Sequence, residues 1–112
     1  MAKKATRTYS RITHLAAALF GKEIRIARKE HKMTAQELAE RASISRGLLQ
    51  RIEKGNLKCQ IGAVFEVATL VGIKLLDADD PSMTLRIRQA DDKIALLPKH
   101  THPVKEAVDD DF

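Results

Sequence analysis

The sequence predicts an all-α fold, and its composition, apolar spacing and helix-end residues all point the same way. Only 4% of the 112 residues are aromatic and Trp is absent, so Leu, Ile, Val and Ala must build the core. Ala, Leu, Arg, Lys and Glu are frequent, and all are good helix formers. Apolar residues recur every three or four positions, between residues that favour helix ends. A chain this short predicts one small domain with a modest core, to which oligomerisation would add stability.

The first predicted helix covers residues 10–31. Its apolar residues are spaced by three or four positions along one expected face: Leu15, Leu19, Phe20, Ile24 and Ala27. Gly21 interrupts the pattern at a cost of roughly 1 kcal/mol relative to Ala, which predicts a kink or a helix in two pieces. Residues 1–9 are polar and basic, and we expect a flexible arm there.

Two short helices are predicted within residues 34–55. Thr34 is followed three residues later by Glu37, a capping box that satisfies two amide donors at a helix start. After a turn, Ser45 is a good N-cap for a second helix over residues 46–54. Gly55 is the residue expected in the left-handed conformation just past that helix. Because each boundary has its own end signal, the segment predicts two helices joined by a tight turn.

That arrangement is a helix-turn-helix, whose second helix lies in the major groove of duplex DNA. Leu49 and Ile52 form the inward stripe of the second helix. The opposite face carries Arg46, Gly47, Gln50 and Arg51, with Ser45 and Lys54 at its ends. Arg can bridge O6 and N7 of guanine, and Gln can pair with N6 and N7 of adenine. The pattern therefore predicts a protein that binds double-stranded DNA.

The charge distribution supports this prediction. Residues 1–58 contain 14 Lys or Arg and 5 Asp or Glu, a net of +9; residues 59–112 contain 6 and 10, a net of −4, and the halves sum to +5. A basic half favours contact with DNA phosphates, which dominate affinity for a duplex. The acidic half indicates a different partner.

Two more helices are predicted beyond the turn. One covers residues 60–71, with Gly72 ending it and an apolar face of Ile61, Val64, Phe65, Ala68 and Val71. Asp80 and Pro81 are typical of a helix start, and an apolar stripe follows at spacings of 4, 3, 4 and 3: Met83, Ile87, Ala90, Ile94 and Leu97. This stripe is the candidate dimer seam, although it could instead cap the core. A strand is the alternative over residues 83–87, because apolar side chains alternate there.

The remaining features of the sequence argue against several kinds of site and classes of protein. A lone Cys59 rules out an internal disulfide or a CxxC metal site, and no phosphate-cradling glycine loop or nucleophile–base spacing is present. We therefore expect no enzyme activity, cofactor or metal. No apolar run spans a bilayer, so we expect a cytoplasmic, nucleoid-associated protein without a membrane partner. Residues 98–112 predict a disordered acidic tail, which leaves residues 10–97 as the expected domain.

Residues 20–76 resemble the Cro/repressor (XRE-type) helix-turn-helix family. The resemblance rests on FGKEIRIARKEHKMTAQELAERA, SISRGLLQRIEKGN and EVATLVGIKLL. It implies five α-helices, a homodimer with two-fold symmetry and a palindromic operator. Two positions depart from the family pattern: Ala35 stands where Gln commonly follows the helix cap and contacts a phosphate, and Ser43 stands where Gly is usual in the turn.

The resemblance also assigns roles to particular residues. Those implied to face base edges are Ser45, Arg46, Gly47, Gln50 and Arg51. Those implied to hold phosphates are Gln36, Lys54, Asn56 and Lys58. Arg28 and Glu53 match a pair that usually forms a buried salt bridge between two helices.

The ends of the chain add a finer resemblance, to HipB-like antitoxins. These bind operator DNA and a HipA-type kinase toxin, and they combine such a domain with a short extension and a tail. The tail ends in Phe112, a candidate residue for docking into a toxin partner. The alternatives are a stand-alone or phage-type repressor without a toxin partner, and an adaptor that has kept the fold without operator recognition.

Overall fold

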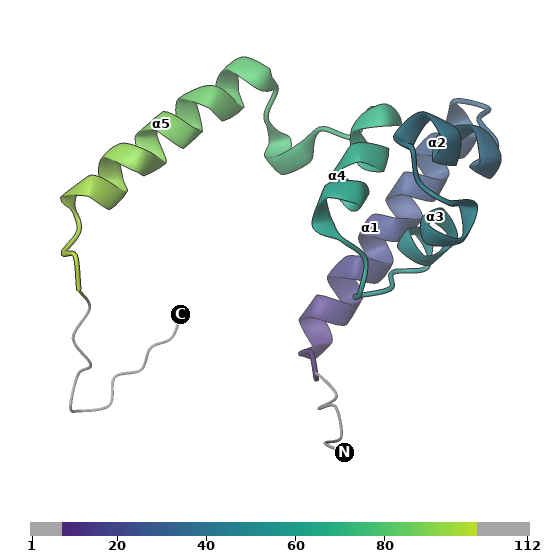
Figure 1. The fold of residues 1–112 in the computed structure, drawn as a ribbon, viewed down its shortest axis with the longest axis horizontal. Helices are drawn as coiled ribbons and strands as arrows, with labels where there is room; N and C mark the ends of the chain where they lie inside the picture. Colours follow the sequence, from purple (N-terminus) through teal and green to yellow (C-terminus); the bar gives the residue numbers. More distant parts are fainter. Residues whose placement is uncertain (1–7, 101–112) are drawn as a thin grey trace. The chain divides into compact units, whose positions relative to one another are not determined.

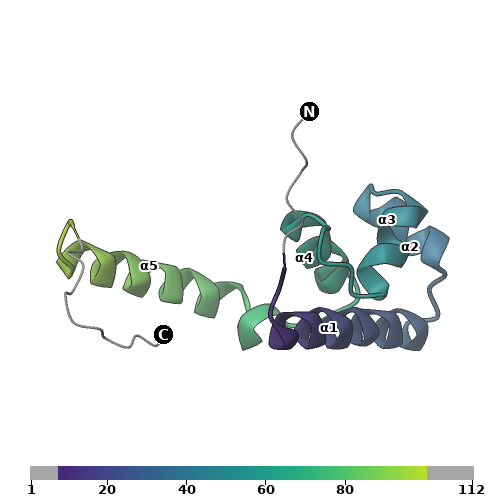
Figure 2. The ribbon, with the colours of Figure 1, turned by 90° about the horizontal axis from the view of Figure 1, so that it is seen from below.

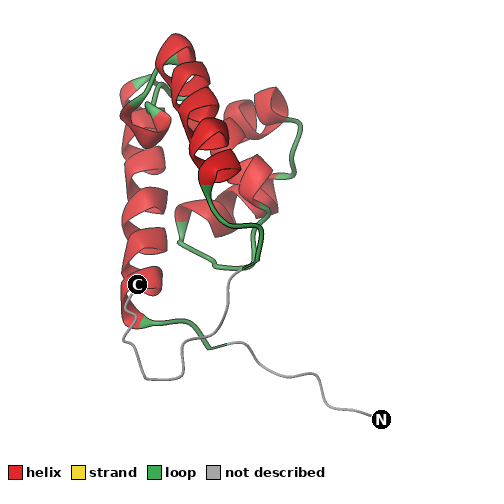
Figure 3. Ribbon diagram, turned by 90° about the vertical axis from the view of Figure 1, so that its left-hand side faces the viewer, coloured by secondary structure: helices red, strands yellow, loops and turns green. Residues whose placement is uncertain are grey.

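The computed structural model describes residues 8–100 of the chain. These residues fall into two compact units, which cover residues 8–77 and 78–100 of the described part. The boundary between the units lies within the domain expected over residues 10–97. All regular structure in the described part is helical (Figure 3), and we describe each unit by itself.

Residues 8–100 form five α-helices, as the sequence predicted (Figure 1). The first unit contains α1 (Arg11–Glu30), α2 (Ala35–Ala42), α3 (Arg46–Glu53), α4 (Ile61–Leu70) and a short 3-10 turn, η1 (Leu75–Asp77). The second contains α5 (Asp80–Leu96). The strand alternative over residues 83–87 is therefore wrong. No described helix combines the length and the apolarity needed to cross a membrane.

The predicted starts of α2 and α3 are confirmed. The Glu37 backbone N–H donates to Thr34 Oγ1 over 3.0 Å, and the Thr34 N–H donates to Glu37 Oε1 over 2.8 Å. This second bond stabilises the carboxylate and lowers the pKa of Glu37 below its usual value. At α3, Ser45 Oγ accepts from the Leu48 N–H over 3.0 Å. Both helices thus begin where side-chain oxygens replace missing backbone acceptors.

The turn between these helices is closed by Ser43 in the left-handed conformation, with φ 58° and ψ 41°. This geometry allows the Ile44 N–H to reach the Ala39 carbonyl oxygen at 3.0 Å and so satisfies an acceptor at the end of α2. A left-handed conformation costs a non-glycine residue about 1–2 kcal/mol. The departure from the family's usual Gly is therefore tolerated at a cost in stability.

The core of the first unit lies between α1 and the three helices gathered on one side of it (Figure 2). Its largest fully buried side chains are Ile24, Leu38, Leu49 and Val67. Val67 fits the helical spacing of α4 but was not among the predicted face residues. Small side chains, including Ala39 and Ala68, bring the helices close together.

Parts of the predicted apolar faces are wrong. Leu15 and Leu19 of α1 are 47% and 59% exposed, and Ile61 and Phe65 of α4 are also exposed. Ile24, by contrast, is fully buried, and Phe20 and Ala27 pack against the core, as predicted. The other buried residues of α1 are Gly21 and Arg28, which apolar spacing could not identify because neither is an apolar side chain.

Gly21 lies where α1 crosses the carboxyl end of α3. A Cβ atom there would be 2.5 Å from the Ile52 carbonyl oxygen and 2.6 Å from that of Glu53. α1 runs unbroken from Arg11 to Glu30, so the predicted kink at Gly21 is wrong. The residue is glycine because two backbones meet there.

A second glycine, Gly55, also lies against the backbone of α1. Gly55 has φ +80°, as predicted for the residue after α3, and a Cβ atom on it would be 2.8 Å from Ala18 Cα. α1 therefore meets both the end of α3 and the turn that follows it.

An ion pair joins the same two helices. Arg28 Nε donates to Glu53 Oε2 over 2.7 Å, and Nη2 donates to Oε1 over 3.0 Å. Arg28 Nη1 also donates to the Met33 carbonyl oxygen over 3.0 Å, which ties in the segment before α2. The side chains are only 10% and 9% exposed, and the bond to Glu53 raises the pKa of Arg28. Removing one partner of such a buried pair typically costs about 3–5 kcal/mol.

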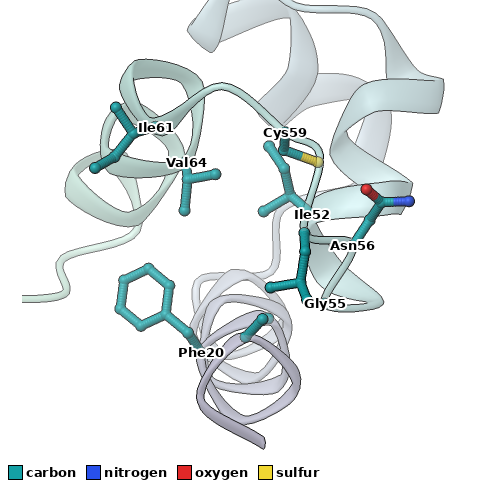
Figure 4. Close-up of a pocket in the computed structure, with 10 residues that line it drawn as sticks. Phe20, Ile52, Gly55, Asn56, Cys59, Ile61 and Val64 are labelled. Carbon is teal, nitrogen blue, oxygen red and sulfur yellow. The ribbon is translucent and has the colours of Figure 1, made fainter. Parts of the chain in front are cut away.

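Beside the crossing lies a mainly apolar hollow of about 190 Å³ (Figure 4). Phe20 of α1 and Ile61 and Val64 of α4 line it, together with Ile52 of α3. Cys59, a partly buried free thiol, lies on its wall. The hollow is thus lined both by a core residue, Ile52, and by an exposed apolar residue of α4, Ile61.

The second unit is organised by α5. Its N-cap is Asp79, whose Oδ1 accepts from the Ser82 N–H over 3.0 Å, so the cap lies one residue before the one expected at Asp80. Donation from Ser82 lowers the pKa of Asp79. No residue of α5 is buried.

The close crossing at Gly21 gives a stability prediction. We expect Gly21→Ala to destabilise the first unit by about 2–3 kcal/mol, because the added methyl group meets backbone oxygens that cannot rotate away. The matched control is Gly62→Ala in α4, where nothing lies within 4 Å of the added Cβ atom. That change should be neutral or stabilise by up to about 1 kcal/mol. Urea denaturation followed by circular dichroism measures both, and equal effects would refute the close approach.

Candidate nucleic-acid interface

The candidate interface is built on α3. Leu49 and Ile52 are buried against the core and fix the rotation of the helix about its axis. The four predicted base-facing residues of the helix are all exposed, and they lie within an arc of about 140° on the opposite side: Arg46, Gly47, Gln50 and Arg51. Sequence spacing and the structure thus bring the same residues together on one surface.

Ser45 and Gly47, two of the predicted base-facing residues, differ in what they can offer a ligand. Ser45 is exposed, but its oxygen already accepts the Leu48 N–H as the helix cap. Its hydroxyl proton remains available to a partner. Gly47 has room for a side chain, because an added Cβ atom would meet only Arg51 Nη1 at 3.8 Å and Ser45 Oγ at 4.0 Å. The fold of the free chain therefore does not require glycine at position 47.

The predicted phosphate-contacting residues are less uniform. Lys54 and Lys58 are exposed cations. Asn56 Oδ1 accepts the Lys58 N–H over 2.7 Å, which orders the loop after α3 and leaves the amide nitrogen free to donate. Gln36 Nε2 donates to Glu40 Oε2 over 2.9 Å. Gln36 is thus engaged within its own helix and lies beside a carboxylate.

A polar hollow of about 290 Å³ adds a residue that the sequence analysis missed. It is lined by Arg25, Arg28, Ala35, Arg46, Gln50, Glu53 and Lys54. Its one carboxylate belongs to Glu53, which pairs with Arg28. Four cations and one anion leave the lining at a formal charge of +3. Within the described part of the chain, Arg25, Arg46 and Lys54 form no ion pair, so the hollow is an open site for an anion.

Ala35 explains why the hollow is open. A longer side chain at this first position of α2 would project toward the space that Arg25 and Lys54 line. This is also the position where the family pattern has a phosphate-contacting Gln. One signal in the sequence could have identified Arg25: it lies three residues before Arg28, hence on a neighbouring part of the same helix surface.

Other predicted elements lie elsewhere. The candidate seam residues belong to the second unit, and Phe112 lies outside the described residues. The expected arm lies outside them except for residues 8 and 9, as does the expected tail beyond residue 100. Among residues 8–100, no three His, Cys, Asp or Glu residues come together as a metal site.

Comparison with known proteins identifies the segment that builds this surface. Residues 24–75, slightly less than half of the chain, match a protein family described as helix-turn-helix. No curated protein and no solved structure matched the chain in the same comparisons. The matched range begins in α1, contains α2, α3 and α4, and ends at η1. These residues are thus similar to a helix-turn-helix domain, the kind of domain that binds DNA in transcription regulators.

Proposed function

We propose that the protein is a sequence-specific repressor whose α3 reads base edges in the major groove of its operator. The observation that carries the proposal is the exposed arc on α3, where two Arg and one Gln side chain lie opposite the buried Leu49 and Ile52. These are side chains that can discriminate guanine and adenine by paired hydrogen bonds. The +3 hollow beside them supplies the sequence-independent attraction to phosphates.

The proposed mechanism is occlusion. Two copies occupy the half-sites of a palindrome, which are separated by about one helical turn, and the bound dimer blocks RNA polymerase. The operator would lie at the protein's own promoter. The adaptor alternative, a domain without operator recognition, predicts no sequence preference among duplexes, and this separates it from the proposal.

The reading role of α3 predicts a loss of both affinity and preference. We expect Arg46→Ala to weaken binding to the preferred duplex, selected from random DNA, by roughly 5- to 150-fold, or about 1–3 kcal/mol. It should also relax the preference at the contacted base pair. The matched control is Arg41→Ala, an exposed cation that lies about 140° around α2 from Gln36. Unchanged affinity and preference for Arg46→Ala would rule out reading by this residue.

The same binding measurement tests how closely the helix approaches DNA at Gly47. Gly47→Ala should leave the fold intact, because the added methyl group makes only ordinary contacts within the chain. A loss of affinity at unchanged thermal stability would therefore come from the DNA side of the interface. Full affinity would show that the duplex backbone or base edges do not reach position 47.

The hollow generates a prediction of a different kind. Arg25→Gln should weaken binding uniformly across duplex sequences and reduce the slope of log affinity against log salt by about 1, since one phosphate contact is lost. Titrations at several salt concentrations measure the slope, with Arg41→Gln as the control for the loss of a distant cation. An unchanged slope in Arg25→Gln would exclude this residue from the phosphate contacts.

We further propose, from the resemblance to HipB-like antitoxins, that the repressor also binds a HipA-type kinase toxin and represses the operon of both. The proposal rests on the arrangement of a helix-turn-helix domain followed by an extension and an acidic end, with Phe112 as the docking residue. The stand-alone or phage-type repressor makes the same prediction for DNA and the opposite one for the kinase.

Copurification distinguishes the antitoxin from the stand-alone repressor. The tagged full chain, isolated from its native source, should bring down a kinase in roughly stoichiometric amount, and a chain ending at residue 97 should recover much less. Phe112→Ala in the full chain tests the docking residue itself. Absence of a kinase from the full-chain preparation would favour the stand-alone repressor and leave operator binding unaffected.

A further inference from the structure

The helix α5 carries an uncovered apolar stripe. Ile87, Ile94 and Leu97 are 59%, 65% and 56% exposed, and Met83 and Ala90 lie on the same line of the helix. Two further apolar residues, Leu85 and Leu96, lie about 200° and 220° around from Met83 and belong to the opposite side. These five residues thus form one stripe along a single side of α5.

The spacing of the stripe is that of a coiled coil. Steps of 4, 3, 4 and 3 residues place Ile87 and Ile94 at a positions of a heptad repeat, and Met83, Ala90 and Leu97 at d positions. Leu97, the C-cap of α5, closes the last repeat. β-Branched residues at a positions favour two parallel strands. A second copy of the same helix therefore fits the spacing.

The charges beside the stripe decide the orientation of that second copy. Arg86 and Lys93 flank one edge of the stripe, at g positions, whereas Asp91 flanks the other edge at an e position with Thr84. In a parallel pair, the g edge of one helix faces the e edge of its partner. In an antiparallel pair, g faces g and e faces e, which sets basic residues against basic ones. Only the parallel arrangement brings opposite charges together.

We propose that two copies of the chain pair through α5 as a short parallel coiled coil, in which Arg86 of each copy faces Asp91 of the other. This deepens the proposed function, because it gives the dimeric repressor its seam and its symmetry axis. Both chains enter such a pair at the same end, and the pair has the two-fold symmetry that a palindrome requires. A seam of two heptads is weak by itself, and two half-sites on one duplex add an effective concentration that strengthens it.

Charge reversal tests the orientation by the sign of the effect. Arg86→Glu and Asp91→Arg should each weaken the dimer by roughly 3- to 10-fold in sedimentation equilibrium, because an attractive pair becomes repulsive twice by symmetry. The double variant should return to within about 3-fold of the unchanged chain. Arg88→Glu, on the side away from the stripe, is the control and should have little effect. Strengthening by Arg86→Glu would overturn the parallel pair in favour of the antiparallel one.

Cross-linking provides a second measurement. In a Cys59→Ser background, Ala90→Cys should form a disulfide-linked dimer on mild oxidation, because a d position faces its own counterpart across a parallel seam. Gln89→Cys, which points away, should not. An antiparallel pair places Ala90 opposite an a position of the partner, either Ile87 or Ile94, and failure of Ala90→Cys to cross-link would count against the proposal.

The stripe has one other possible occupant, residues 8–77 of the same chain. In that case Ile94→Asp would lower the thermal stability of the first unit and leave sedimentation unchanged, which would overturn the proposal. The expected result is the reverse: a lower dimer fraction at unchanged stability of the first unit. A chain that is monomeric at every attainable concentration also overturns the pairing. An unchanged chain that forms the dimer but shows no sequence preference among duplexes would instead contradict the proposed function alone.

Discussion

The close crossing of α1 over the carboxyl end of α3 is the constraint on which the exposed surface of α3 depends. At Gly21 the backbones meet with no room for a side chain, and at Gly55 the turn after α3 comes against Ala18. Arg28 and Glu53 then fix the same two helices in register through two hydrogen bonds. Since α3 is only eight residues long, it could not hold its orientation alone. The crossing therefore decides which face of α3 is turned outward.

This constraint also explains what the sequence could predict. Helix ends are local events, so Thr34 with Glu37, and Ser45, identified the starts of α2 and α3 correctly. The number of helices and the exposed arc on α3 follow from spacing for the same reason. The position of α1 against α3 depends on a glycine whose importance comes from a backbone 31 residues away, at Ile52. Read locally, Gly21 indicated only a break in a helix.

The errors in the predicted core have a related cause. On α1 the inward stripe holds Gly21 and Arg28, whereas Leu15 and Leu19 lie on the outward side. Apolar spacing therefore found Ile24 but not its two inward neighbours, because one of them is used for close approach and the other for an ion pair. Arg25 was missed for the same reason: its relation to the interface depends on Ala35 of α2 and on the crossing, and neither is visible along one helix. The departure at Ala35 was visible, but only the fold shows that it opens a basic hollow.

The two proposed activities, recognition of base edges by α3 and pairing of two copies through α5, are linked by the free energy that operator selection needs. Three side chains on one α3, at about 2 kcal/mol of discrimination each, give about 6 kcal/mol. A genome offers at least about 10⁶ competing sites, which corresponds to about 8 kcal/mol at 1.4 kcal/mol per tenfold. One copy therefore falls short of selecting a single operator, whereas two coupled copies reach about 12 kcal/mol. On this arithmetic the function proposed for α3 requires a second copy of the domain, and the proposed pairing through the stripe of α5 would supply it.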